Sequence, residues 1–199
     1  MKQYTAITVL ALAGIANAEP PDIEYIYPAG AQRGKTVSVR IGGYYFHGQA
    51  NFEMLGGGVN FQPAIKRTKT IWFEGPLIHQ PLSQQSENYP KDHLNEIAIS
   101  NDAVLGQRLW RCWTSQGVTK TLKFVIGNLP EVMENEMPGR PIPQEVSLPV
   151  TANGRIFPRE DVDVWAFTAK AGEIIVMDAA AKRFGSPLSI VLAVQNAKG

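Results

Sequence analysis

The sequence is poor in cysteine. Cys112 is its only cysteine, so no disulfide can form within the chain. A domain without disulfides must rely on its hydrophobic core for stability. We therefore predict that Cys112 is a small apolar residue, buried on one face of a strand and chemically inert.

An excess of charge of one sign is also absent. Lys2 is the only charged residue among the first eighteen, so the 19 basic side chains of the whole chain leave 18 in residues 19–199, against 18 acidic ones. Nucleic acids and anionic membranes are bound largely through excess positive charge. This balance argues against both as partners.

Familiar catalytic motifs are missing. The sequence contains no Gly-x-Ser-x-Gly, no His-Glu-x-x-His and no phosphate-binding glycine loop. The three histidines, His47, His79 and His93, are far apart and have no acidic residue at metal-ligand spacing. We predict a protein that is not an enzyme, with its histidines on surface loops.

Only the N-terminus carries a long apolar run. Lys2 precedes the mostly apolar stretch Ala6 to Ala16, and Ala16-Asn17-Ala18 has the small-x-small pattern that signal peptidase cleaves. The run is too short for a membrane span, which needs about 20 apolar residues. We predict a signal peptide over residues 1–18, a secreted or periplasmic location, and no membrane span after cleavage.

The rest of the chain alternates between apolar and polar residues with the period of β-strands. Thr36 to Ile41, Asn95 to Ile99 and Thr121 to Ile126 each place apolar side chains on one face. Glycine and proline turns separate these runs. Short strands at close spacing predict an all-β chain built as sandwiches.

Three motifs in residues 22–127 carry a resemblance to a known family. They are Tyr27-Pro28-Ala29-Gly30, Arg33-Gly34-Lys35-Thr36-Val37 and Ile41-Gly42-Gly43-Tyr44-Tyr45-Phe46, followed by closing strands at Gly106 to Gly117 and Phe124 to Gly127. This order resembles the immunoglobulin-like IPT/TIG family. The resemblance implies an Ig-like β-sandwich, which we place at residues 19–128.

A proline- and glutamate-rich stretch, residues 129–144, follows and is typical of an extended, solvated linker. Beyond it lie four motifs: Asn153-Gly154-Arg155-Ile156, Asp161 to Phe167, Ala171-Gly172-Glu173 and Phe184 to Leu188. They resemble the bacterial pre-peptidase C-terminal (PPC) domain. The resemblance implies a jelly-roll-like sandwich, found beside catalytic domains of exported enzymes and in extracellular proteins without any. PPC domains are usually longer, so we expect residues 145–199 to be a truncated, partial module.

The PPC resemblance also suggests a calcium-binding site. In some such domains, acidic residues of the linker and of the Asp-x-Asp strand hold Ca²⁺ through oxygen atoms. The matching positions are Glu134, Glu136, Asp161 and Asp163. Met137-Pro138-Gly139 replaces oxygen-donating residues of the family pattern, so solvated linker and turn acids are the alternative. We expect no cofactor other than calcium.

Aromatic residues suggest a carbohydrate-binding platform, because flat rings stack on sugar faces. The candidate ligand-facing side chains are Trp72 and Trp113. Neighbouring residues in a strand point to opposite faces, so core packing is the alternative role for aromatic side chains here.

The sequence thus favours an exported, non-catalytic structural or interaction module, forming the N-terminal part of a larger extracellular or periplasmic protein. Its partners would be other domains of that protein, or an extracellular protein or polysaccharide. Two alternatives stay open: an accessory prefix of a secreted hydrolase whose catalytic domain lies elsewhere, and a polysaccharide-binding module.

Overall fold

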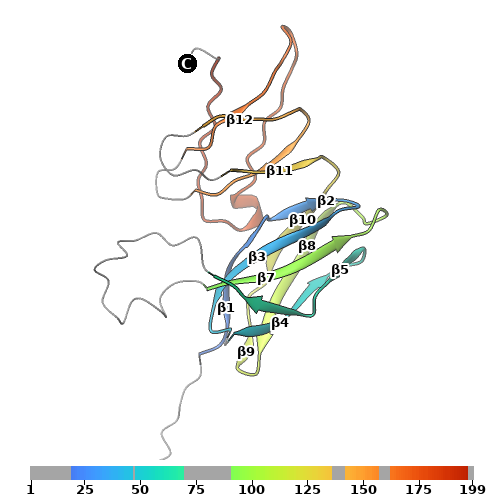
Figure 1. Cartoon of the computed structure of the whole chain (residues 1–199), viewed down its shortest axis with the longest axis vertical. Helices are drawn as coiled ribbons and strands as arrows, with labels where there is room; N and C mark the ends of the chain where they lie inside the picture. Colours follow the sequence, from blue (N-terminus) through green and yellow to red (C-terminus); the bar gives the residue numbers. More distant parts are fainter. Residues whose placement is uncertain (1–18, 47, 70–90, 136–141, 157–161, 197–199) are drawn as a thin grey trace, which may run out of the picture.

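The computed structural model describes residues 19–46, 48–69, 91–135, 142–156 and 162–196. The predicted signal peptide, 1–18, lies outside these ranges. The described chain is all-β apart from one short 3-10 helix, η2 (Lys182–Phe184), which confirms the predicted fold class (Figure 1). None of the described segments forms a helix with the length and apolar character needed to cross a bilayer.

Residues 22–127, which we call the first module, contain ten strands joined in one strongly curved sheet. Its path is β1-β3-β7-β6-β4-β8-β10-β2, with β5 paired to β7 and β9 paired to β8. The strands are β1 (Asp22–Tyr27), β2 (Gly30–Gln32), β3 (Thr36–Tyr44), β4 (Gln49–Leu55), β5 (Val59–Phe61), β6 (Ala64–Arg67), β7 (Lys91–Ile99), β8 (Gly106–Thr114), β9 (Gly117–Val118) and β10 (Leu122–Gly127).

The N-terminal segment contributes the strands at both edges of this sheet. β1 pairs antiparallel with β3, whereas β2, only two residues further on, pairs parallel with β10 at the other end of the path. The chain therefore switches from one edge to the other between Tyr27 and Gly30, and the sheet folds on itself as a nearly closed sandwich (Figure 1).

The alternation read from the sequence puts the apolar faces inside. Val39 and Ile41 on β3, Ile97 on β7, and Phe124 and Ile126 on β10 are all buried. The three runs predicted from Thr36, Asn95 and Thr121 are confirmed as parts of β3, β7 and β10.

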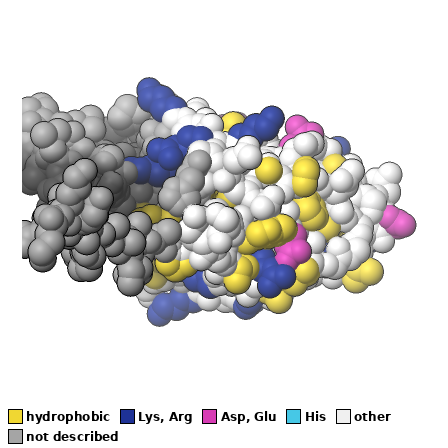
Figure 2. Space-filling view, turned by 90° about the horizontal axis from the view of Figure 1, so that it is seen from below, with side chains coloured by type: hydrophobic (Ala, Val, Ile, Leu, Met, Phe, Trp, Pro, Cys, Tyr) yellow, Lys and Arg dark blue, Asp and Glu magenta, His cyan; other side chains and the backbone are white. Residues whose placement is uncertain are grey.

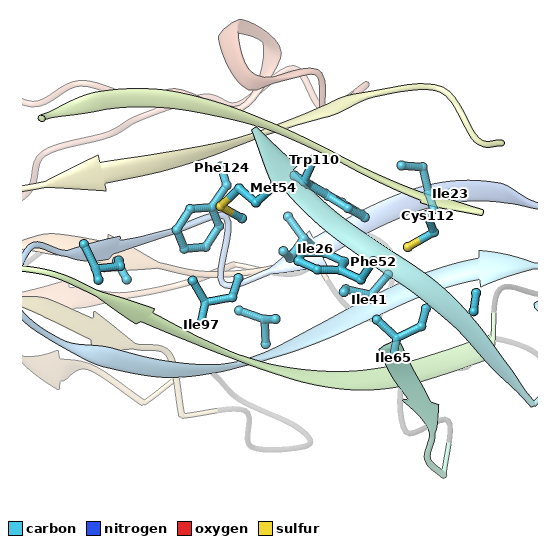
Figure 3. Close-up of a cluster of buried hydrophobic side chains, with 14 of the residues drawn as sticks. Ile23, Ile26, Ile41, Phe52, Met54, Ile65, Ile97, Trp110, Cys112 and Phe124 are labelled. Carbon is cyan, nitrogen blue, oxygen red and sulfur yellow. The ribbon is translucent and has the colours of Figure 1, made fainter. Parts of the chain in front are cut away.

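Large aromatic and branched side chains fill the space between the two layers (Figure 3). Phe52 stacks on Trp110 with 5.7 Å between ring centroids, and meets Phe61 edge-on at 5.2 Å. Cys112 lies in this core fully buried, and its burial raises the pKa of the thiol to about 12. The predicted burial of Cys112 is confirmed, and a thiol held protonated at neutral pH is a poor nucleophile.

His93 does not occupy a surface loop, so that part of the histidine prediction is wrong. It lies on β7, fully buried, with its ring edge-on to Phe46 at 4.9 Å. Its Nδ1 is 2.9 Å from the carbonyl oxygen of Lys91; since that oxygen can only accept, Nδ1 carries the proton. His47 and His79 lie outside the described residues.

The described residues from 131 to 196, which we call the second module, have many fewer paired strands. β11 (Glu131–Met133) runs parallel to β13 (Thr151–Asn153), and β12 (Gln144–Glu145) runs parallel to β14 (Trp165–Ala166). Part of the predicted linker, 129–144, thus forms the paired strand β11, and its last residue begins β12. The jelly-roll character of residues 145–199 stays a prediction.

Candidate functional site

Trp113 stands at the end of β8, on the outer face of the sandwich. The preceding residue, Cys112, points into the core, so Trp113 points outward. It lies opposite Asn51 on β4 and opposite Val118 on β9. The β8–β9 hairpin and the start of β4 therefore bring the ring and a side-chain amide to the same outer surface.

A hollow of about 280 Å³ opens beside the Trp113 ring. Its wall carries amides, hydroxyls and two alanines but no charged side chain. We call it the Trp113 hollow; it is lined by Gln49, Ala50, Asn51, Ala64, Trp113, Thr114, Ser115 and Gln116. The other predicted aromatic, Trp72, lies outside the described residues.

The rim of the hollow is held by the β8–β9 turn. The hydroxyl of Thr114 accepts the backbone N–H of Gln116 at 3.2 Å and donates to the Gln116 side-chain oxygen at 3.1 Å. Across the hollow, the exposed side chains of Gln49 and Asn51 form no hydrogen bond with any described residue. Their amides are available to a ligand, while the turn is already fixed.

Figure 2 views the molecule from below, the end of the first module at which β9 lies. Hydrophobic side chains are scattered there among uncharged groups and several lysines and arginines, and acidic groups are fewer. On the outer face of β8, Arg111 already forms an ion pair with Glu53 of β4. The nearest charges on these two strands are therefore paired with each other.

The calcium candidates are partly brought together. The carboxylates of Glu134 and Asp163 both lie close to Gly154: a Cβ there would be 2.5 Å from Glu134 Oε2 and 2.9 Å from Asp163 Oδ2. A larger residue at this position would require at least one of the two carboxylates to shift. Glu136 and Asp161 lie outside the described residues, so the proposed four-residue set cannot be assembled from the described part of the chain.

Arg155 supplies positive charge beside these two carboxylates. Its backbone N–H donates to Glu134 Oε2 at 2.7 Å, and its guanidinium lies 4.0 Å from Glu134 Oε1. Both side chains are largely buried, with 6% of Glu134 and 15% of Arg155 exposed. No group of three or more potential metal ligands occurs among the described residues. Calcium stays a prediction, and the contact seen here is between a carboxylate and a guanidinium.

The same arginine reaches the first module. Its guanidinium lies 5.3 Å from the centre of the Tyr27 ring, and the Tyr27 hydroxyl donates to the backbone oxygen of Asn153 at 3.1 Å. On β10, the Lys123 ammonium donates to the backbone oxygen of Arg183 at 2.9 Å. The second module therefore packs on the outer side of β1 and also touches β10.

A buried polar group lies next to this contact, and the sequence reasoning missed it. The Tyr25 hydroxyl donates to Asp92 Oδ1, and Arg40 Nη1 donates to Asp92 Oδ2 at 3.1 Å. Burial, followed by the hydrogen bond to Asp92, raises the pKa of Tyr25 well above its usual value. Asp92 is fully buried although it is on the outer face of β7. The available signal was Tyr25 and Tyr27 together on one face of β1.

Comparisons with known proteins give little more. No protein-family model matches the chain, and no curated protein matches it. Among solved structures, the SrpA adhesin of Streptococcus sanguinis is similar at 18% identity and a TM-score of 0.32, over 57% of this chain and 58% of that one. A point mutant of the same adhesin gives 14% identity and a TM-score of 0.32, over 54% and 58%.

The chain thus spans somewhat more than half the length of either adhesin. A TM-score of this size is too low to carry an argument about function. The IPT/TIG and PPC resemblances remain predictions from the sequence motifs.

Proposed function

We propose that this chain is a non-catalytic interaction module of an exported protein, and that the Trp113 hollow binds an uncharged saccharide. The observation that supports this is the hollow itself: an outward-pointing indole bordered by side-chain amides and hydroxyls, with no charged group in its lining.

The chemistry of the lining matches that of a sugar ring. A pyranose has an apolar C–H face, which packs on an aromatic ring, and a rim of hydroxyls that both donate and accept hydrogen bonds. Trp113 offers the ring. Gln49 and Asn51 each offer an amide that can donate and accept at once.

The absence of charge in the lining points to the kind of saccharide. Phosphate, sulfate or carboxylate groups are bound in proteins by arginine and lysine through charge-assisted hydrogen bonds. The lining residues provide none of these, and Arg111 on the same face is engaged by Glu53. The lining itself therefore suits a neutral glycan; the exposed Lys66, opposite Gln49 on β6, lies beside the lining and is not part of it.

Binding to a panel of neutral and acidic polysaccharides, measured by affinity electrophoresis or on a glycan array, tests the proposal. The Trp113→Ala variant should weaken binding to the best neutral glycan at least about tenfold, or 1.4 kcal/mol. Leu109→Ala is the matched control, because Leu109 is on the outer face of the same strand and 42% exposed. It should bind as the unchanged chain does.

Two outcomes would contradict the proposal: no neutral glycan binding at all, or equal losses in the Trp113→Ala and Leu109→Ala variants. The exported location is tested separately. N-terminal sequencing of the protein recovered from the producing cell should start at Glu19. The alternative role as prefix of a hydrolase would be supported by a catalytic domain encoded downstream of Gly199 in the same reading frame.

A further inference from the structure

A second pair of polar side chains lies one step along the strands from the Trp113 hollow. Asn51 faces Trp113 across β4 and β8, and the next outward-facing residues of the two strands, Glu53 and Arg111, also face each other. The residues between them point into the core, so both cross-strand pairs are on the same outer face. Alternate residues of a strand are about 7 Å apart, so these four residues form one continuous surface, which we call the polar strip.

The Arg111–Glu53 pair is open to solvent and has hydrogen-bonding capacity left over. The two side chains are 41% and 29% exposed, and Arg111 Nε donates to Glu53 Oε1. Within the described part of the chain, neither side chain takes part in any other hydrogen bond or ion pair. The terminal nitrogens of the guanidinium therefore keep their donors, and Glu53 Oε2 keeps its lone pairs.

This remaining capacity suits adjacent hydroxyls of a sugar ring. One hydroxyl can accept a hydrogen bond from the guanidinium of Arg111 while its neighbour donates one to the carboxylate of Glu53. Because the pair balances its own charge, it does not favour an acidic saccharide over a neutral one. The contact between the two side chains also holds the guanidinium beside Glu53, rather than over the ring of Trp113.

The next cross-strand pair ends the polar strip. Leu55 and Leu109 face each other there, 44% and 42% exposed, and their side chains have no group that could hydrogen-bond a hydroxyl. The strip is thus two cross-strand pairs long. A sugar ring stacked on Trp113 occupies the first pair, so Arg111 and Glu53 are placed to meet a second ring of the same glycan.

We propose that Arg111 and Glu53 form a second sugar-binding position, and that the protein recognises a chain of two or more neutral rings rather than a single one. The second position exists only if the hollow binds a saccharide, so the proposal rests on the proposed function. It adds a role for two further residues, which is to select the length of the ligand.

The test compares single sugars with short chains of the same sugar. The probes are the neutral malto-, cello-, manno- and chito-oligosaccharides of one to three rings, and calorimetry or NMR titration gives their dissociation constants. At least one trimer should bind at least about tenfold more tightly than its own monomer. Glu53→Ala together with Arg111→Ala should reduce this gain to about threefold or less. Removing both partners leaves no unpaired charge, and an exposed ion pair contributes little to folding.

Asp178→Ala together with Arg183→Ala is the matched control, because it removes another exposed ion pair, one in the second module. This variant should keep the full gain with length, whereas Trp113→Ala should weaken binding of monomer and trimer alike. Circular dichroism checks that each variant is folded.

Two kinds of failure are distinguishable. Trp113→Ala weakens binding in the first kind, but trimers bind no more tightly than monomers, or the Glu53 and Arg111 double variant keeps the gain, or the control loses it equally. The second position is then wrong and the hollow stands. In the second kind, none of these saccharides binds, or Trp113→Ala changes nothing, and both proposals are overturned.

Discussion

The two modules treat the same kind of residue in opposite ways. Every hydrophobic residue buried in the described structure lies between Ile23 and Ile126, whereas the branched side chains at 174, 176 and 191 are almost fully exposed. Both regions carry strand-like apolar patterns. An apolar pattern therefore does not by itself create a core: enough paired strands must form a second layer to cover it.

The difference follows from the number of strands. Ten strands surround the first core, while the second module has four short strands in two separate pairs. A two-stranded sheet alone is marginally stable in water. The second module gains support from the first, through Tyr27 and Asn153 on one side and Lys123 and Arg183 on the other.

The largest expected effect comes from disrupting the core of the first module. Trp110→Ala removes a fully buried indole that stacks on Phe52, and it should lower the free energy of unfolding by about 3–5 kcal/mol. Val176→Ala in the second module should change it by less than about 0.5 kcal/mol, because little of that side chain is packed. Urea unfolding followed by circular dichroism measures both.

The contrast between the two modules would be contradicted if the two substitutions lowered the free energy of unfolding by similar amounts. Val176 would then be buried in the protein in solution, either within one chain or between two copies. Repeating the Val176→Ala measurement at several protein concentrations separates these cases, since only burial between copies depends on concentration.

A smaller effect is expected where the two modules meet. Arg155→Met keeps an apolar stem near Tyr27 but removes the guanidinium beside Glu134, which is 6% exposed. A buried carboxylate that loses its cation is strongly destabilising, here by about 3 kcal/mol. The cost should fall on the second module, and it is measured as faster hydrogen exchange in β13 with β7 unchanged.

Arg183→Met is the matched control for this contact. Arg183 also pairs with a carboxylate, Asp178, but both side chains are more than half exposed. Exposed ion pairs contribute about 0–1 kcal/mol. If Arg155→Met accelerates exchange no more than Arg183→Met does, the buried pair does not hold the second module.

The strands of the first module were predictable because the alternation of apolar and polar residues in each matches the burial of its side chains. The face formed by Val39 and Ile41 in β3, and the burial of Cys112 in β8, follow from the period of two. Trp113 could be predicted as outward-facing for the same reason. The hollow beside it could not, because Gln49 and Asn51 come from β4, which is more than sixty residues away along the chain.

The remaining misses have a common physical cause. Polar residues are assigned to loops and linkers when read one at a time, but Asp92 and Glu134 are buried because arginines from distant segments lie next to them. His93 is buried because its neighbours on β7 fix the strand and Phe46 covers its ring. Pairings between residues this far apart leave no local pattern in a single sequence.

The last prediction has the smallest expected effect: acidification should destabilise the first module and stabilise the second. Burial, together with the nearby charge of Arg67, lowers the pKa of His93 below its usual value, although the Lys91 carbonyl and Asp92 oppose this. The unfolded chain then takes up a proton before the folded one does. Stability of the first module should therefore fall as the pH drops below about 6.5.

Glu131 on β11 behaves in the opposite way. Burial raises the pKa of its carboxyl, against the hydrogen bond from Asn153. The folded chain takes up this proton first, so acidification between the raised pKa and the ordinary value stabilises the second module. Hydrogen exchange of β7 and β13, corrected for intrinsic rates and compared between about pH 7 and about pH 5, should show protection falling in β7 and rising in β13. His93→Gln, which can still donate to the Lys91 carbonyl, should abolish the first change, and Glu131→Gln the second. If acid shifts both strands in the same direction, and neither variant alters that shift, other groups dominate the response.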